Sequence, residues 1–301
     1  MKQYIELVKR VVNEGESRGD RTGTGTHGIF GHFLEHDLKT GFPLMTHKKM
    51  GIKSIAAELV WFLAGQTGNQ ALEQMGSTIW REWADDEDRL GPIYGAQWRG
   101  RDGAPVDQIA NLLYDLDHHR ESRRLLVLAW NPAVLPESGK LPHEQPAIGK
   151  QALPACHFAF QMYVNNNDEL DLMFHLRSSD VMLGAPYNIA SYSLLVHLFA
   201  QMLGYVPGKI CVTFGDTHIY QDHLDSGGVD EILSRPLHKL PTYTTSTYFD
   251  LTADKKDRDH DYYARELDRL FLHNQHDTLR EVIGGLSGYV SEPSVKFNVS
   301  V

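Results

Sequence analysis

Residues 153–188 read LPACHFAFQMYVNNNDELDLMFHLRSSDVMLGAPYN, and this stretch decides the centre of the fold. Two apolar, extended segments, 157–164 and 170–176, flank a run of three asparagines and an aspartate, which is a strong signal for a hairpin turn. A glycine-proline corner at 184–186 then opens a largely apolar helix over 188–203. The stretch therefore predicts two antiparallel strands followed by a helix.

The same stretch carries four groups of complementary chemistry. Cys156 supplies a thiol, Arg177 a fixed cation, Asp180 a carboxylate and Asn188 a carboxamide. Brought together, such groups hold an anionic, planar substrate and attack it with sulfur. We therefore interpret the chain as an enzyme.

The remainder of the chain predicts a single domain over 1–301, because no linker rich in proline, glycine or serine divides it. Apolar residues at helical spacing predict further helices, and short apolar runs predict buried strands. Residues 131–152 predict a loop insertion. The expected helices are 2–14, 52–64, one around 109–116 and 262–283; the expected strands are 125–130 and 209–214, with 215–220 as a turn into another helix.

The composition of the chain argues against several classes of protein. The net charge of −10 argues against a general nucleic-acid surface, because binding to a polyphosphate depends on clustered Lys and Arg. No apolar run suggests a signal peptide or a membrane span, and the two cysteines are too few for a disulfide framework. We expect a cytoplasmic protein. Sixteen histidines occur without metal-ligand spacing, so no metal site is expected.

Arg21 and Glu58 are candidate residues outside the central stretch, and the sequence around each of them allows two interpretations. Arg21 lies in the glycine-alternating run DRTGTGT at 20–26, which fits either a phosphate-binding loop or a hairpin turn with a solvated arginine. Glu58 lies among the apolar positions of the 52–64 helix. It is either salt-bridged, with Lys48, Lys49 or Lys53 as partner, or a carboxyl with a raised pKa suited to proton transfer.

Aromatic and hydroxyl-binding candidates are also ambiguous from the residues alone. Trp80 and Trp83 are three apart, so one helical turn would present both rings to the same side, as core or as a platform for a flat heterocycle. His218 and Tyr220 offer groups that bind hydroxyls, although Asp216 and Thr217 beside them also fit a capping role.

These pieces, taken in order, resemble the thymidylate synthase family, which also includes pyrimidine hydroxymethylases. The resemblance covers roughly residues 1–245. The matching pieces are DRTGTGT at 20–26, ELVWFL at 58–63, TIWREW at 78–83, LGPIYG at 90–95, SRR at 122–124, Cys156-His157, RSSD at 177–180, NIASY at 188–192 and GDTHIY at 215–220.

The resemblance implies an α+β fold, in which a twisted mixed sheet flanked by helices packs face to face with its twin in a homodimer. It implies dUMP and 5,10-methylenetetrahydrofolate as substrates, with Cys156 adding to C6 of the pyrimidine and Arg177 lowering the thiol pKa. It further implies roles for Glu58 and Tyr94 in moving protons. The expected phosphate ligands are Arg21, Arg177, Ser178 and, from the partner subunit, Arg123 and Arg124; the ribose ligands are His218 and Tyr220; the folate side is formed by Trp80, Trp83, Asp180, Gly184 and Val301.

Asn188 indicates which base is read. Uracil presents an acceptor at O4 and a donor at N3, and a carboxamide complements both groups at once. Cytosine presents the opposite pattern, which suits a carboxylate better. The residue therefore favours a uridine nucleotide over a cytidine nucleotide.

Some positions depart from the family pattern. Ala155 replaces a proline before the cysteine, Leu176 replaces a glutamine before the arginine, and Ala185 and Tyr187 replace leucine and phenylalanine. From about residue 250 to 290 the strand-rich ending gives way to a charged, partly helical segment. These departures leave two products open: dTMP, if folate reduces the methylene at C5, or 5-hydroxymethyl-dUMP, if water adds to it. A non-catalytic nucleotide-binding relative is the third reading.

Overall fold

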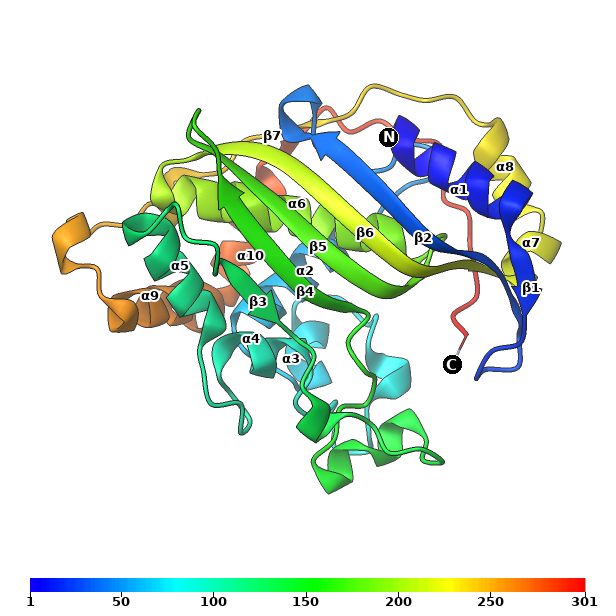
Figure 1. Ribbon diagram of the computed structural model, residues 1–301, viewed down its shortest axis with the longest axis horizontal. Helices are drawn as coiled ribbons and strands as arrows, with labels where there is room; N and C mark the ends of the chain where they lie inside the picture. The colour runs from blue at the N-terminus through cyan, green and yellow to red at the C-terminus, as the bar shows by residue number, and fades with distance from the viewer. Residues whose placement is uncertain (301) are drawn as a thin grey trace.

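The computed structural model describes residues 1–300 and is built on one six-stranded sheet, shown in Figure 1. The strand order is β1-β2-β6-β5-β4-β3, and only β5 and β6 run parallel, so the sheet is mixed as expected. A two-stranded sheet lies apart from it. The strands are β1 Glu16–Arg18, β2 Thr26–Asp37, β3 Leu126–Leu128, β4 His157–Val164, β5 Glu169–Asp180, β6 Val206–Tyr220, β7 Thr242–Tyr243 and β8 Leu286–Ser287.

The predicted hairpin forms the middle of this sheet. Strands β4 and β5 pair antiparallel, and Asp168 in the turn adopts a left-handed backbone with φ 59°. Strand β5 continues to Asp180, beyond the expected end at residue 176, because β6 pairs with it as far as the pair Asp180 and His218. The candidate residues Arg177, Ser178 and Asp180 are thereby part of the sheet.

Helices surround this sheet and confirm the α+β class. α6 packs against β5 and β6 and covers one face, which Figure 1 shows behind the strands. α2 is buried over the whole of 55–63, because α6, α4 and α10 pack around it. The α-helices are α1 Lys2–Glu14, α2 Ile52–Leu63, α3 Asn69–Gln74, α4 Tyr94–Arg99, α5 Gln108–His118, α6 Gly184–Leu203, α7 Gln221–Asp225, α8 Gly228–Ser234, α9 His260–Leu267 and α10 Gln275–Gly284.

The other face of the sheet carries exposed apolar side chains. Strand alternation points Phe174 toward Tyr192 of α6, with ring centroids 4.2 Å apart, and points Met173 and its cross-strand partners the opposite way. On this outer face Phe33, Leu126 and Tyr163 are 54%, 45% and 62% exposed. The outer face of the sheet therefore exposes several large apolar side chains, which are frequent in protein interfaces.

Two expectations about the elements were wrong. Residues 215–220 are not a turn: they are the end of β6, held on both sides by β2 and β5, and α7 begins only at Gln221. The segment 262–283 is not one helix, since α9 passes into a π-helix at Asp268–His273 and α10 starts after Asn274. The spacing of apolar residues along a short segment cannot indicate that two distant strands pair with it, or that a helix changes from α to π geometry.

The 131–152 insertion is a loop with three short 3₁₀ helices, Pro132–Val134, Pro142–Glu144 and Pro146–Ile148. Buried Gln145 orders its tip by donating to the carbonyls of Glu137 and Lys140 and accepting from the Glu137 N–H. Among residues 1–300, no helix combines the length and the apolar character needed to cross a membrane.

Candidate active site

The parallel pairing of β5 with β6 gathers the substrate-binding candidates at one end of the sheet. Ser178 lies opposite Asp216 and Asp180 lies opposite His218, while Tyr220 pairs with Thr26 at the start of β2. The loop before β2 is folded by Asp20, which accepts from the N–H groups of Thr22 and Gly25 at 3.0 and 2.7 Å. Arg21 is exposed in this loop.

Cys156 and Arg177 lie in contact. Nη2 of Arg177 is 3.8 Å from the sulfur, while Nε and Nη2 donate to the carbonyls of Ala155 and Pro154 at 2.9 and 2.8 Å. The guanidinium also lies over the ring of Trp130, 5.5 Å from its centroid. Burial raises the pKa of the Cys156 thiol, and Arg177 acts in the opposite direction. The expected lowering by Arg177 is present, but burial outweighs it.

Tyr94 joins the cysteine to the helices. Its hydroxyl accepts the Cys156 backbone N–H at 2.8 Å, and its ring stacks on His157 with centroids 4.0 Å apart. Nδ1 of His157 is 3.0 Å from the hydroxyl of Tyr192. Burial lowers the pKa of His157 to about 3, so this imidazole is neutral at physiological pH. Tyr94 thus stands between the thiol and the helical core.

Glu58 is a buried carboxyl with a raised pKa, not a salt-bridge partner. Its Oε1 accepts from Nε1 of Trp80 at 2.7 Å, and among residues 1–300 no cationic side chain reaches salt-bridge distance. Burial raises its pKa to about 7, and the Trp80 bond acts against that rise. Lys48, one of the expected partners, instead donates to the Met182 carbonyl at 2.6 Å.

The tryptophans extend this group of aromatic residues. Trp80 is 8% exposed and packs edge-on against Tyr94, with centroids 6.0 Å apart. Trp83, half-buried, lies 5.6 Å from the Trp80 ring in a 3₁₀ turn, Arg81–Trp83, not the expected α-helical turn. Trp80 therefore serves as core and hydrogen-bond donor, and Trp83 offers the more accessible ring.

Asn188 lies one turn into α6, with Gly184 close to its carboxamide oxygen. Within residues 1–300 its carboxamide makes no hydrogen bond, so both of its polar ends are available. Arg123 and Arg124 are not brought to the cysteine. They precede β3, whose antiparallel register with β4 places them near Tyr163, at the far end of β4 from Cys156.

The C-terminal segment is docked beside this end of the sheet. Asn298 accepts at its carbonyl from Nε2 of His223 at 2.8 Å, and the Phe297 ring packs 4.8 Å from the His223 ring. Ser300 Oγ reaches Thr24 Oγ1 at 3.3 Å. Asp180 accepts from the N–H groups of 182 and 183 behind it. Val301 lies outside the described residues.

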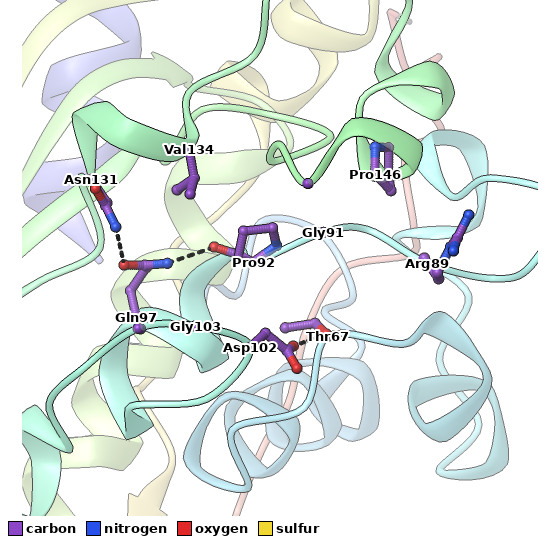
Figure 2. Close-up of a pocket in the computed structure, with 12 residues that line it drawn as sticks. Thr67, Arg89, Gly91, Pro92, Gln97, Asp102, Gly103, Asn131, Val134 and Pro146 are labelled. Atoms are coloured by element: carbon purple, nitrogen blue, oxygen red, sulfur yellow. Dashed lines mark hydrogen bonds between the residues drawn. The ribbon is translucent and has the colours of Figure 1, made fainter.

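A separate cavity of about 370 Å³ lies under the insertion and does not include Cys156 (Figure 2). Asn131 donates to Gln97 at 3.0 Å, and Gln97 donates to the Pro92 carbonyl at 2.9 Å. Gly91 has a left-handed backbone, and a Cβ there would lie 1.9 Å from the Lys150 carbonyl oxygen. The insertion is therefore packed onto the turn that leads into Tyr94.

The thiol of Cys156 lies beside the Arg177 guanidinium, and Tyr94 and Trp80 connect it to the buried carboxyl of Glu58. These contacts give the candidate site its geometry. The comparison with known sequences then gives the family. The chain belongs to the thymidylate synthase family, whose profile it matches over residues 2–267, and it is a one-carbon transferase.

Its relatives support this assignment. It is 47% identical over 242 residues to a protein of Francisella philomiragia subsp. philomiragia named thymidylate synthase, covering 80% of this chain and 87% of the relative. A protein of the same name from Francisella tularensis subsp. holarctica has the same identity and coverage.

The sequence alone assigns no role to three residues that the structure brings to the site. Tyr192 and His157 support Tyr94, and Trp130 lies against Arg177. Tyr192 follows Asn188 by four residues, so helical spacing places both on one face, and that spacing was the available signal. The stack of His157 on Tyr94 joins segments 63 positions apart, which no local pattern indicates.

The raised pKa of Glu58 predicts a pH-dependent penalty on folding. The folded chain binds this proton more tightly than the unfolded chain, whose Glu titrates near 4.5, so stability is lost as pH rises from about 4.5 to 7. Glu58→Gln mimics the protonated form. By urea unfolding we expect it to be about 3 kcal/mol more stable than wild type at pH 8 and within about 1 kcal/mol at pH 5. An equal difference at both pH values would contradict the assignment.

Proposed function

We propose that the protein transfers the one-carbon unit of 5,10-methylenetetrahydrofolate to C5 of dUMP and releases dTMP and dihydrofolate. The observation that carries this proposal is the contact of Cys156 with Arg177 at the end of β5, beside the β6 residues His218 and Tyr220. The family and its relatives supply the reaction class.

In this proposal Cys156 is the nucleophile. Its sulfur forms a bond to C6 as the C5–C6 double bond opens and negative charge moves to O4 and C5, and C5 then bonds to the one-carbon unit. C5 loses its proton as the carbon–nitrogen bond to folate breaks. Hydride from tetrahydrofolate then adds to the methylene at C5 while the sulfur leaves C6, which gives dTMP and dihydrofolate. Asn188 would donate to O4 and accept from N3, which stabilises the charge that develops at O4. Glu58, with its pKa near 7, and Tyr94, whose hydroxyl adjoins the cysteine backbone, would move protons at the pyrimidine.

The phosphate and ribose would bind at the end of the sheet. Arg21, Arg177 and Ser178 would hold the phosphate, since guanidinium groups form paired hydrogen bonds with its oxygens. His218 and Tyr220 would bind the ribose hydroxyl. Their rings lie 5.3 Å apart and edge-on, and Nδ1 of His218 is 2.8 Å from Asp216, which leaves the other ring nitrogen for a ligand.

The folate would supply both the carbon and the hydride. Trp83, half-buried beside Trp80, provides an aromatic face for a flat ring. We place the pterin at Asp180, with Gly184 on the same side. Val301, the remaining expected folate residue, lies outside the described residues. The docked segment before Ser300 supports water exclusion and hence dTMP over the hydroxymethyl product. Leu176 and Ala185, which raised the alternative, are buried in the core.

We propose a homodimer in which the outer sheet faces meet. The exposed side chains of Phe33, Leu126 and Tyr163 support this packing. Arg123 and Arg124, exposed and remote from Cys156 in their own chain, would then reach the phosphate of the partner.

We also propose that the enzyme works in the cytoplasm, where free thiols such as Cys156 and Cys211 stay reduced. We propose that it needs neither metal nor nucleic acid.

Mass identification of the nucleotide after incubation with dUMP and methylenetetrahydrofolate tests the reaction. We expect dTMP with dihydrofolate; a hydroxymethyl product with tetrahydrofolate would establish the alternative, and unchanged dUMP would refute catalysis.

Cys156→Ala should abolish turnover while dUMP binding stays measurable by calorimetry, because the other ligands remain. Substantial turnover by Cys156→Ala would exclude the thiol as nucleophile.

Asn188→Asp tests how the base is read. A carboxylate complements the exocyclic amine of cytosine and repels O4 of uracil, so preference should move toward dCMP by on the order of 1–3 kcal/mol. The measurement is the ratio of kcat/KM for the two nucleotides. An unchanged ratio would remove Asn188 from base recognition.

Subunit mixing tests the shared site. Cys156→Ala and the double variant Arg123→Ala/Arg124→Ala should each be nearly inactive. A mixed dimer combines the intact cysteine of one subunit with the intact arginines of the other. After exchange in equal amounts, about a quarter of the sites should therefore be complete. Activity that stays at the sum of the two variants would show that the arginines do not cross the interface.

A further inference from the structure

Arg99, at the end of α4, is a buried cation with an extensive set of partners. Its side chain is fully inaccessible to solvent, its Nε donates to both carboxylate oxygens of Asp107 at 3.1 and 3.0 Å, and its Nη1 donates to the Leu63 carbonyl. Nη2 donates to Asp268 at 2.8 Å. A buried guanidinium is tolerated only when its charge and N–H groups are matched in this way.

Asp268 brings the C-terminal segment to this point. It is the first residue of the π-helix, and its two oxygens also accept from Nη2 of Arg101 at 2.7 Å each. Burial acts to raise the pKa of Asp268, but its bonds to Arg101 and Arg99 outweigh this and hold the pKa below its usual value. The carboxylate is therefore ionised and bound to two cations.

Both helices that carry the proton-transfer candidates end at this cluster. Leu63, whose carbonyl Arg99 binds, is the last residue of α2, which holds Glu58; α4, which ends at Arg99, begins with Tyr94. The two helices fit closely: at Gly65, just after α2, a Cβ would lie 2.9 Å from the Arg99 Cβ. A displacement of the cluster therefore moves both helices.

The C-terminal segment also covers the back of α2. α10 and the π-helix pack against α2, and Figure 1 shows α10 beside α2. Gln275 adds a hydrogen bond of 2.6 Å to Gln66. The family profile matches only to residue 267, so Asp268 and α10 come from the part of the chain beyond that match.

We propose that Asp268 is a positioning residue: by binding Arg99 and Arg101 it holds the ends of α2 and α4 together and so fixes Glu58 and Tyr94 relative to each other on the two sides of Trp80. The π-helix and α10 then act as a brace, by which we mean that they hold α2 and α4 in a fixed relative position. This inference rests on the proposed roles of Glu58 and Tyr94. It adds a determinant of rate that lies outside the substrate pocket.

Asp268→Asn tests the brace, since it keeps the shape and removes the charge that two arginines share. We expect kcat for dTMP formation to fall about tenfold to a hundredfold, because small misplacements of catalytic groups have effects of this size. The KM for dUMP should stay within about twofold, because the nucleotide ligands lie at the end of the sheet. Asp268→Glu should recover most of the rate.

Asp277→Asn is the matched control, because it removes an equal charge from the same segment at an exposed pair with Arg280. Its kcat should equal that of wild type. A merely structural role for Asp268 would lower the melting temperature and leave the kcat of folded enzyme unchanged. A folded Asp268→Asn variant with a kcat within about twofold of wild type would therefore overturn the proposal.

Two further measurements keep the test decisive. If Asp268→Asn does not fold, Arg101→Gln removes only the outer ion pair, and an unchanged kcat there would overturn the brace. Titration of Glu58 by carbon-13 NMR needs no turnover, and its pKa should move by about half a unit or more in Asp268→Asn. Wild type that forms no product would refute the proposed function, and the titration would still decide the role of Asp268.

Discussion

The parallel hydrogen bonding between β5 and β6 is the constraint on which the site depends. It fixes which residues of two strands stand side by side, so that Ser178 meets Asp216 and Asp180 meets His218. The crossover through α6 that joins these strands also carries Asn188. A single topological unit, strand–helix–strand, therefore carries Arg177, Asn188 and His218.

Desolvation sets the chemistry around Cys156. It raises the pKa values of the thiol and of Glu58 and lowers that of His157, so three titratable groups are biased toward their neutral forms. Arg177 is the charge that remains in contact with the sulfur. Neutral surroundings with a fixed cation favour an anionic ligand, and they leave Glu58 able to give and take a proton near neutrality.

The hairpin and the apolar helices could be predicted from the sequence because their signals are local. A turn of Asn165 to Asp168, or apolar residues at a spacing of three and four, needs no knowledge of distant partners. The pairing of the hairpin then brings Cys156, before β4, next to Arg177, near the end of β5. The end of β6 could not be predicted, because Gly215 to Tyr220 are extended only through pairing with two other strands.

The contacts within the candidate site also join residues that are distant in sequence. The sequence around Glu58 allows two readings, and its hydrogen-bond partner, Trp80, is 22 positions away. The stack of His157 on Tyr94 and the ion pairs of Asp268 likewise join residues that are remote in sequence. The motifs indicate the candidate site residues. Only the tertiary contacts show which side chains hold each of them in place.

The docking of the last residues has a practical consequence. Ser300 contacts Thr24 in the loop that carries Arg21, so a peptide fused to the C-terminus would crowd this loop. Met1 is itself 4% exposed, which makes the other terminus a poor attachment point as well. The exposed tip of the insertion around Gly139, with open space about its backbone, is the better place for an affinity label.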